Sequence, residues 1–331
     1  WDLDGVPAVL NDVNGGLVGF YRALQDGARR ESVREALERI GARRLAIRRT
    51  VAGLSEAAVR GFFNRPQAWV ARHQEAMAGA PTLTGLDERF RLLLTKHAAA
   101  KGGRVDRFRD GGAGAFPVNE LRPHIETAAQ SAWYETLREV YNGLLEVETG
   151  WNEASWWAVR VLCYSGMFRF SRKGHFNVPY GGTSYNARDF ADSMDDLFGP
   201  ARVAELQRLT VEALDFEALF QKHHGFASTD FVFVDPPYDS AFSRYNVEAD
   251  FSARDQERLR DVLVASPARW MLVIKRTDFI EQLYTRDGVH LHVFGKTYAA
   301  NFRNRHARDV EHLVATNYAL RVHGDDPLKP L

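Results

Sequence analysis

The sequence predicts an α/β protein whose sheet contains buried, parallel strands, and three segments carry this prediction. Residues 231–234 read Phe-Val-Phe-Val, and such a short apolar run is typical of a strand covered on both faces. Pro236 and Pro237 follow and cannot donate to a ladder, so the strand has to end before them. Apolar runs at 270–274 and 313–318 predict two more strands.

Helices are predicted both between these strands and before them. Ser252 can cap a helix whose Leu259, Val262 and Leu263 recur at helical spacing. Helical periodicity also dominates residues 51–150, interrupted by a loop expected over 101–116. We therefore expect a helical insertion in the α/β domain. Its loop is either an arm that orders on a partner or a solvated linker.

Residues 235–238, Asp-Pro-Pro-Tyr, place specific chemistry at the end of the first predicted strand. Open α/β sheets bind ligands at such strand ends. Asp235 can accept a hydrogen bond, the prolines leave carbonyl groups without N–H partners, and Tyr238 offers a flat ring. A planar group with an exocyclic amine, such as a nucleobase, would fit all three. The alternative is a rigid turn with an aspartate cap.

The tetrad Asp235-Pro236-Pro237-Tyr238 resembles the catalytic motif of methyltransferases acting on DNA base amines, and the stretches around it resemble the Dam-type (D12 class) adenine methyltransferases. The resemblance implies a Rossmann-like methyltransferase sheet, S-adenosylmethionine as cofactor and catalysis by these four residues. The target base has to be flipped out of the duplex, and stacking on Tyr238 would return about 1–3 kcal/mol of that cost. Hydrogen bonds to Asp235 and the Pro236 carbonyl would activate the amine.

Two further stretches resemble the cofactor-binding segments of the family. Residues 9–21 are similar to its second strand and following helix, which implies that Asp12 binds the cofactor ribose. Asp215 and Phe216 are similar to the pair that flanks the cofactor adenine, and Asp235 is expected to contact the cofactor as well. Without the resemblance, Asp12 would be interpreted as a helix cap.

Residues 167–181 are similar to the family's DNA-facing loop, which turns through a glycine into a phenylalanine-asparagine-x-proline-aromatic-glycine signature. The chain departs from the family at Ser171, where asparagine is usual. Interleaved cations and aromatic rings suit phosphate contact and insertion between bases, whereas the alternative is a basic surface hairpin. The resemblance implies double-stranded DNA as partner, and the DNA-binding residues that it implies are Arg169, Phe170, Arg172, Lys173, Asn177 and Tyr180 here and Arg303 and Arg305 near the C-terminus.

The same resemblance predicts the domain organisation. A methyltransferase catalytic core is expected over 1–50 and 151–331, including the DNA-binding loop 167–181, and a target-recognition insertion over 51–150. In the family a glycine-rich turn that holds the methionine part of the cofactor lies upstream of the stretch matching 9–21, and no later segment supplies it. We expect this first strand and turn in a part of the protein preceding Trp1. The alternatives are a strand from another polypeptide, or its loss.

Charge and cysteine content limit the function classes. The 43 Lys and Arg residues balance 43 Asp and Glu residues, so DNA binding would depend on local clusters, and the cluster around Arg43 and Arg44 is expected to be a solvated helix face. The single cysteine, Cys163, is expected in the core, and no Cys or His spacing predicts a metal site. No apolar run approaches the roughly 18 residues that span a membrane. A cytoplasmic protein is expected.

Two other functions fit parts of the sequence. The first is methylation of the cytosine amine, although enzymes of that class more often have serine in place of Asp235. The second is a catalytically silent DNA-binding subunit, against which the intact tetrad argues. For the enzyme, a cognate restriction endonuclease is a further expected partner.

Overall fold

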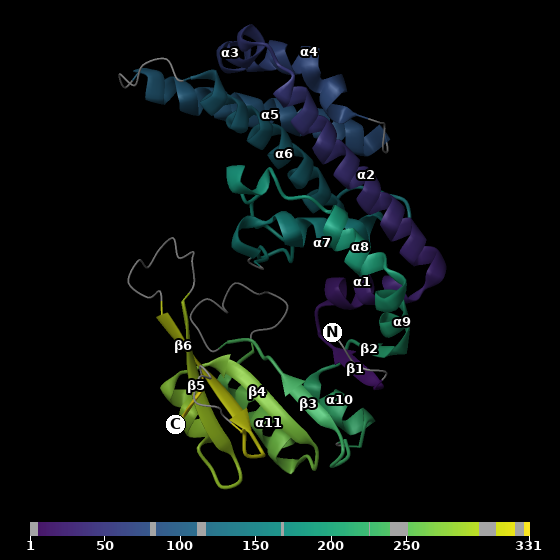
Figure 1. Cartoon of the computed structure of the whole chain (residues 1–331), viewed down its shortest axis with the longest axis vertical. Coiled ribbons are helices and arrows are strands. Elements are labelled where there is room, and N and C mark those ends of the chain that lie inside the picture. Colours follow the sequence, from purple (N-terminus) through teal and green to yellow (C-terminus); the bar gives the residue numbers. More distant parts are fainter. Residues whose placement is uncertain are drawn as a thin grey trace. The chain divides into compact units, whose positions relative to one another are not determined.

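A computed structural model of the chain describes residues 6–79, 84–110, 117–166, 169–224, 226–238, 251–297, 309–321 and 328–331. The chain forms two compact units (Figure 1). The first unit comprises Trp1–Leu10 and Asn14–Val211, and the second comprises Asn11–Val13 and Glu212–Leu331. The expected target-recognition stretch, 51–150, lies wholly within the first unit.

Helices dominate the first unit, and local sequence explains where several of them begin. The side chains of Asn14, Asp26 and Ser55 each accept a hydrogen bond from a first-turn backbone N–H, which is the usual N-cap arrangement. Pro66 opens another helix, where its missing N–H costs nothing. The helices are α1 (Gly15–Gln25), α2 (Gly27–Ala52), α3 (Glu56–Asn64), α4 (Pro66–Ala78), α5 (Thr84–Asp110), α6 (Val118–Tyr141), α7 (Trp151–Leu162), α8 (Ala191–Phe198) and α9 (Pro200–Arg208).

Helix α5 corrects the prediction of a loop over 101–116. The helix continues to Asp110, and residues 111–116 lie outside the described residues. Gly102 and Gly103 suggested a break, but a glycine costs a helix only about 1 kcal/mol relative to alanine. A helix already formed over its first 18 residues can extend through that cost, because elongation is easier than nucleation.

The arginine cluster of α2 also differs from the prediction. Arg43 and Arg44 are buried, at 1% and 4% exposure, rather than forming a solvated face. Arg43 pairs with Asp87, and its guanidinium lies 4.6 Å from the centre of the Trp133 ring. Arg44 donates to Gln130 and to backbone carbonyls that include that of Tyr185. The partners come from other segments, so the spacing within α2 could not reveal them.

The second unit is a mixed α/β structure, which confirms the predicted class at that level. Its sheet has the order β3-β4-β6-β5-β7, in which β3 and β4 are parallel and the remaining neighbours are antiparallel. All three predicted strands are present, although the last ends at Thr316. The strands are β3 (Phe231–Val234), β4 (Arg269–Lys275), β5 (His290–Thr297), β6 (Asp309–Thr316) and β7 (Lys329–Pro330).

A separate pair of strands, β1 (Ala8–Asn11) and β2 (Leu209–Glu212), forms a two-stranded sheet. The division between the two units passes through both strands. Strand β1 is followed by α1, as the resemblance of residues 9–21 implied. The C-terminal ends of both strands, with the turns after them, therefore belong to the second unit.

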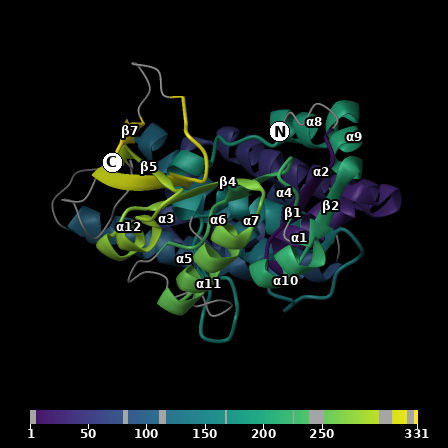
Figure 2. The ribbon, with the colours of Figure 1, turned by 90° about the horizontal axis from the view of Figure 1, so that it is seen from below.

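Helices α10 (Phe216–Lys222), α11 (Ala253–Ala265) and α12 (Asp278–Tyr284) lie on one side of the five-stranded sheet (Figure 2). Their apolar side chains pack on alternate residues of β4 and β6 and form the core of the unit: Phe220, Leu259, Leu263, Trp270, Leu272, Ile274, Ile280, Tyr284, Leu313 and Ala315. The predicted helix after Ser252 is confirmed, because Ser252 and Asp255 form a reciprocal capping box at the start of α11.

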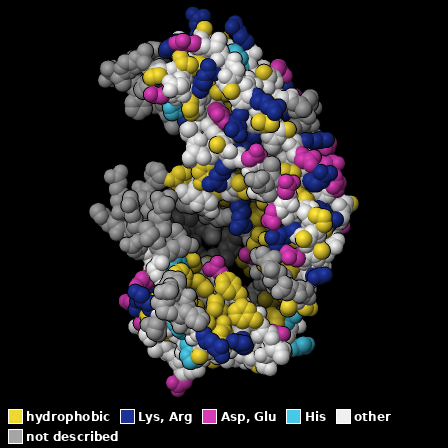
Figure 3. Space-filling view, in the orientation of Figure 1, with side chains coloured by type: hydrophobic (Ala, Val, Ile, Leu, Met, Phe, Trp, Pro, Cys, Tyr) yellow, Lys and Arg dark blue, Asp and Glu magenta, His cyan; other side chains and the backbone are white. Residues whose placement is uncertain are grey.

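The opposite face of β3 differs from the prediction. Phe231 and Phe233 are 57% and 59% exposed, so β3 is not covered on both faces by the described residues. In Figure 3 hydrophobic side chains gather on the surface over β3 and β4. Among the described strands, β3 has only β4 as a neighbour in its sheet, so a strand at the edge of the described sheet carries a sequence typical of an interior one.

Within the parts of the chain that the structure describes, no helix combines the length and hydropathy needed to cross a membrane.

Candidate active site and nucleic-acid interface

Strand β3 ends directly before the tetrad. Asp235 is exposed, Pro236 is buried and Tyr238 is half-buried. The Tyr238 ring meets the ring of His312 from β6 edge-on, with centroids 5.7 Å apart and planes at 70°. Asp235 follows Phe231 and Phe233 at alternate positions, so all three lie on the same face of β3.

Gln256 of α11 holds the backbone of the tetrad through a hydrogen bond. This residue was not among those predicted from the sequence. The side chain is 1% exposed, and its Nε2 donates to the Pro237 carbonyl at 3.0 Å. The Pro236 carbonyl accepts no hydrogen bond from any described residue. A sequence signal did exist, because Gln256 lies on the same helical face as the buried Leu259 and Leu263. A polar residue on a core face requires a partner.

The two predicted cofactor acids follow the paired strands β1 and β2. Both polar groups of the Asn11 amide bond the backbone of Leu214: Nδ2 donates to its carbonyl at 2.9 Å, and Oδ1 accepts from its N–H at 3.0 Å. The Asp12 N–H donates to the Glu212 carbonyl at 3.4 Å. These bonds bring the turn containing Asp12 beside the turn that leads to Asp215.

Asp12 is not the cap of the helix that follows it. Asn14 fills that position, since its Oδ1 accepts from the Leu17 N–H at 3.0 Å. The structural interpretation of Asp12 as a helix cap is therefore wrong, and its carboxylate sits in the turn between β1 and α1.

The two carboxylate oxygens of Asp215 differ in their hydrogen bonds. Its Oδ1 accepts from the Glu217 N–H at 2.9 Å, as the N-cap of α10, and from Arg258 Nη2 at 3.0 Å. Among the described residues, Oδ2 has no hydrogen-bond partner. Phe216 is the first residue of α10, and the guanidinium carbon of Arg258 lies 4.8 Å from its ring centre.

Arg258 is a second residue that sequence reasoning missed. It also pairs with Glu217 and with Asp255, whose Oδ1 is 2.7 Å from Nη1. The hydrogen bonds to Glu217 and Asp255 raise the pKa of Arg258, so the charge is permanent. The first two turns of α11 thus hold both the tetrad, through Gln256, and the predicted adenine-binding acid, through Arg258.

The predicted DNA loop forms a tight hairpin in the first unit. Phe170 and Phe176 face each other across an antiparallel bridge, and the Ser171 N–H donates to the His175 carbonyl at 2.7 Å. The Ser171 hydroxyl accepts from the Lys173 and His175 N–H groups, both at 3.3 Å. Gly174 adopts φ 75°, a conformation that favours glycine. Ser171 therefore stabilises the turn itself.

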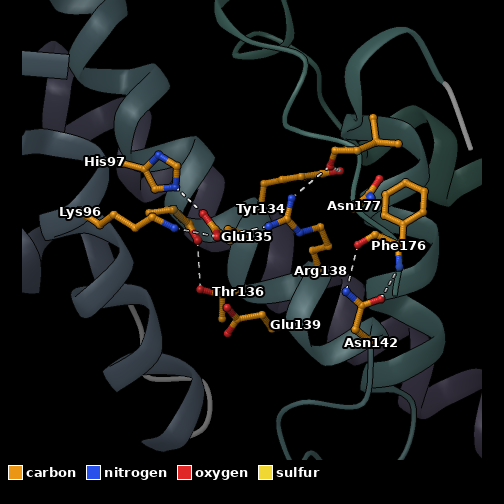
Figure 4. Close-up of polar contacts among 12 residues, drawn as sticks. Lys96, His97, Tyr134, Glu135, Thr136, Arg138, Glu139, Asn142, Phe176 and Asn177 are labelled. Carbon is orange, nitrogen blue, oxygen red and sulfur yellow. Dashed lines mark hydrogen bonds and ion pairs between the residues drawn. The ribbon is translucent and has the colours of Figure 1, made fainter. Parts of the chain in front are cut away.

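Helix α6 and its C-cap residue Asn142 anchor the second half of this loop through three side chains spaced one turn apart (Figure 4). Tyr134 Oη and Arg138 Nη1 donate to the Val178 carbonyl at 2.8 and 3.3 Å. The Asn142 amide bonds both the N–H and the carbonyl of Phe176. Burial raises the pKa of Tyr134, so the hydroxyl remains a donor.

Glu135 ties this part of α6 to α5 (Figure 4). Lys96 Nζ lies 3.0 Å from its Oε1, and His97 Nε2 lies 2.7 Å from its Oε2. Arg138 approaches Oε1 at 3.2 Å. The hydrogen bond with His97, followed by that with Lys96, lowers the pKa of Glu135 to about 2.

The structure separates the predicted DNA-binding residues into two groups. Arg172 and Lys173 are exposed at the turn, and Arg169 is exposed while its Nε donates to Asn177 Oδ1 at 2.7 Å. Phe170 and Tyr180 instead pack into the core, at 7% and 8% exposure. The Tyr180 hydroxyl lies 3.1 Å from Asn186 Oδ1. Arg303 and Arg305 lie outside the described residues.

The prediction that Cys163 lies in the core is confirmed. Cys163 is buried, and burial raises the pKa of its thiol to about 11. Within the described ranges, no three His, Cys, Asp or Glu side chains are grouped to hold a metal ion.

Comparison with known proteins identifies one family to which this chain is similar. The D12 class N6 adenine-specific DNA methyltransferase profile matches residues 118–300, more than half of the chain. The chain is 31% identical over 163 residues to the type II methyltransferase M.CviBI of Paramecium bursaria Chlorella virus NC1A, a match covering 48% of this chain and 58% of the relative. It is 28% identical over 183 residues to the retron Ec67 DNA adenine methylase of Escherichia coli, covering 54% and 60%.

A third relative is the type II methyltransferase M1.LlaDCHI of Lactococcus lactis subsp. cremoris, 29% identical over 164 residues that are 47% of this chain and 54% of the relative. The chain thus spans little more than half the length of the curated relatives it matches. The family match includes the predicted DNA loop, Asp215 and the tetrad, and it confirms the resemblance found in the sequence. This chain belongs to the D12 class N6 adenine-specific DNA methyltransferase family.

Proposed function

We propose that this protein methylates the exocyclic amine of a flipped adenine at specific sites in double-stranded DNA, with S-adenosylmethionine as the methyl donor. One observation carries the proposal. In a chain of this family, β3 ends at an exposed Asp235 and at a Pro236 carbonyl that no described residue occupies. These are two acceptors for the two N–H groups of one amine.

The chain's own residues would activate the amine by position. Asp235 and the Pro236 carbonyl accept its two N–H groups, and Tyr238 supports the flipped base by stacking. Two acceptors favour a tetrahedral nitrogen whose lone pair is available for attack. Gln256 keeps the Pro237 carbonyl engaged and so fixes the backbone between Asp235 and Tyr238. The cofactor, when bound, supplies an electrophilic methyl group, so positioning and electrostatics are the protein's contribution.

The residues of the second unit fit the adenosine half of the cofactor. Asp12, in the turn after β1, can accept both ribose hydroxyls, as strand-end acids do in dinucleotide folds. The open Oδ2 of Asp215 can accept the adenine amine, and the partly buried Phe216 ring can pack on the base. Asp235 would lie near the end of the cofactor that carries the transferred methyl group. This arrangement supports a Rossmann-like methyltransferase core.

DNA contact is proposed for the hairpin and the helices of the first unit. Arg172 and Lys173 would bind phosphates, while Arg169 and Asn177 would act as the bonded pair seen at the base of the turn. Phe170 and Tyr180 would hold the shape of the loop from inside. Helices within 51–150 would supply target recognition, and Arg303 and Arg305 further cationic contacts. A cytoplasmic location and a cognate restriction endonuclease are further parts of the proposal, and two of the relatives are named type II methyltransferases.

Analysis of modified nucleosides tests this proposal directly. Full-length protein, duplex DNA and S-adenosylmethionine should yield N6-methyladenine, and Asp235→Ala should lower turnover on the order of 100-fold or more, the usual scale for losing a preorganised polar partner. Asp278→Ala, an exposed acid in the first turn of α12, is the matched control. N4-methylcytosine as the product would instead support the cytosine alternative. No product from protein that binds both DNA and cofactor would identify a silent subunit, and turnover of Asp235→Ala within tenfold of wild type would remove its assigned role.

A further inference from the structure

We propose that His312 of β6 is a positioning residue that holds the Tyr238 ring in the orientation needed to stack on the target base. The inference rests on the proposed function and assigns a residue outside the tetrad to it. Its basis is an edge-on contact between the two rings, with centroids 5.7 Å apart and planes at 70°. Edge-to-face geometry is a favoured arrangement of aromatic pairs.

His312 is itself held rigidly by the sheet. It is 2% exposed, and its cross-strand partner on β5 is Phe294. The imidazole stacks on the Phe294 ring with centroids 5.1 Å apart and planes at 19°. On its other side, β6 pairs with β4, and Lys275 lies opposite His312. Three rings from β5, β6 and the tetrad thus form a continuous aromatic contact.

The sheet ladder does not reach Tyr238, so a side-chain contact from β6 can help to orient its ring. Tyr238 lies four residues beyond the end of β3, after two prolines that cannot join the ladder. Gln256 fixes the backbone at Pro237, but that bond does not determine how the Tyr238 ring turns about its χ angles. The buried ring of His312 limits those rotations, so the Tyr238 ring presents a fixed face to the base.

The contacts of His312 indicate a positioning role rather than a catalytic one. The imidazole contacts the ring of Tyr238, the residue proposed to stack on the target base. It therefore acts through Tyr238. Loss of the contact should affect the flipped base and the turnover number, and should leave cofactor binding unchanged.

The unit contains a matched control in His292 of β5. Like His312 it is buried, at 7% exposure, and it lies on the same face of the neighbouring strand, opposite Val314. It makes no ring contact with Tyr238. Replacing His292 disturbs the same sheet without touching the aromatic contact.

The experiment measures turnover and the fluorescence of 2-aminopurine placed at the target position, in His312→Ala, His312→Leu, His312→Phe and His292→Ala. We expect His312→Ala to lower kcat about three- to tenfold, as for loss of one aromatic pair, and to change the 2-aminopurine signal. His312→Phe should restore kcat and the 2-aminopurine signal to wild-type values. His292→Ala should leave both quantities at wild-type values. The cofactor affinity of all four should match wild type by calorimetry.

Three outcomes would overturn the proposal: wild-type kcat and fluorescence in His312→Ala, equal losses in His292→Ala, or no difference between His312→Phe and His312→Leu. The last comparison remains decisive if His312→Ala fails to fold, because leucine fills the space without offering an aromatic edge. Absence of methyladenine with wild-type protein would instead reject the proposed function. The two failures are therefore distinguishable.

Discussion

The side-chain amide of Asn142 holds both backbone polar groups of Phe176, accepting from its N–H at 2.8 Å and donating to its carbonyl at 3.0 Å. Phe176 is 1% exposed, so these backbone groups have little access to water. The C-cap residue of α6 thereby fixes the returning half of the hairpin that carries Arg172 and Lys173 (Figure 4).

Asn142→Ala should weaken both the fold and DNA binding. Leaving buried backbone groups unsatisfied costs about 1–3 kcal/mol of unfolding free energy, which urea denaturation measures. DNA affinity should fall because the hairpin loses its anchor, while calorimetry should give an unchanged cofactor affinity. Asn152→Ala, at an exposed position of α7, is the control and should behave as wild type. Equal DNA affinity in the two variants would contradict the assignment of the hairpin to DNA.

Replacement of Arg172 and Lys173 by alanine should weaken binding to all duplexes. If each contacts a phosphate, the slope of log affinity against log salt should become shallower by about one unit per lost contact. The control is the double variant Arg39→Ala and Arg208→Ala, which removes two exposed cations of the same unit. If sequence preference relaxes while the salt slope stays constant, the loop reads bases instead. No change in affinity, slope or preference would place residues 167–181 away from DNA.

Asp12→Ala and Asp215→Ala should each weaken S-adenosylmethionine binding by about 1–3 kcal/mol, the scale for losing a charged hydrogen-bond partner. Arg258→Ala should also weaken it, because Arg258 fixes Oδ1 of Asp215 and covers one side of Phe216. Calorimetry without DNA measures all three. The control is Arg260→Ala, two residues further along α11, whose ion pair is with the neighbouring Asp261. Unchanged affinity in both aspartate variants would show that the pocket lies elsewhere.

Glu135→Gln should change how stability depends on pH. The pKa of Glu135 lies below its ordinary value of 4.5, at about 2, so its stabilising charge is present above pH 4.5 and is lost as the pH falls toward 2. At pH 7 the variant should lose at most about 3 kcal/mol of unfolding free energy, and the difference from wild type should shrink below pH 4.5. Urea denaturation at several pH values measures it. Glu88→Gln, at an exposed position of α5, should leave the pH profile unchanged; a pH-independent difference for Glu135→Gln would refute the ionic role.

Local sequence was sufficient for the elements and motifs whose causes are local. Two prolines end β3, a Ser252 capping box begins α11, and helical spacing places Leu259 and Leu263 in the core. The tetrad and the stretches that resemble the D12 family are likewise contiguous in sequence, so the family could be recognised from them.

Tertiary structure alone decided which polar side chains are buried and what they hold. Arg43 pairs with a carboxylate 44 residues away, Asn142 bonds a residue 34 positions later, and Gln256 reaches back 19 residues to the tetrad. Burying a charge or an amide is favourable only where a partner is supplied, and that partner comes from another segment. No period or spacing within one helix carries this information. The sequence therefore determined the chemistry at the end of β3, and the packing of distant segments determined which side chains keep that chemistry in place.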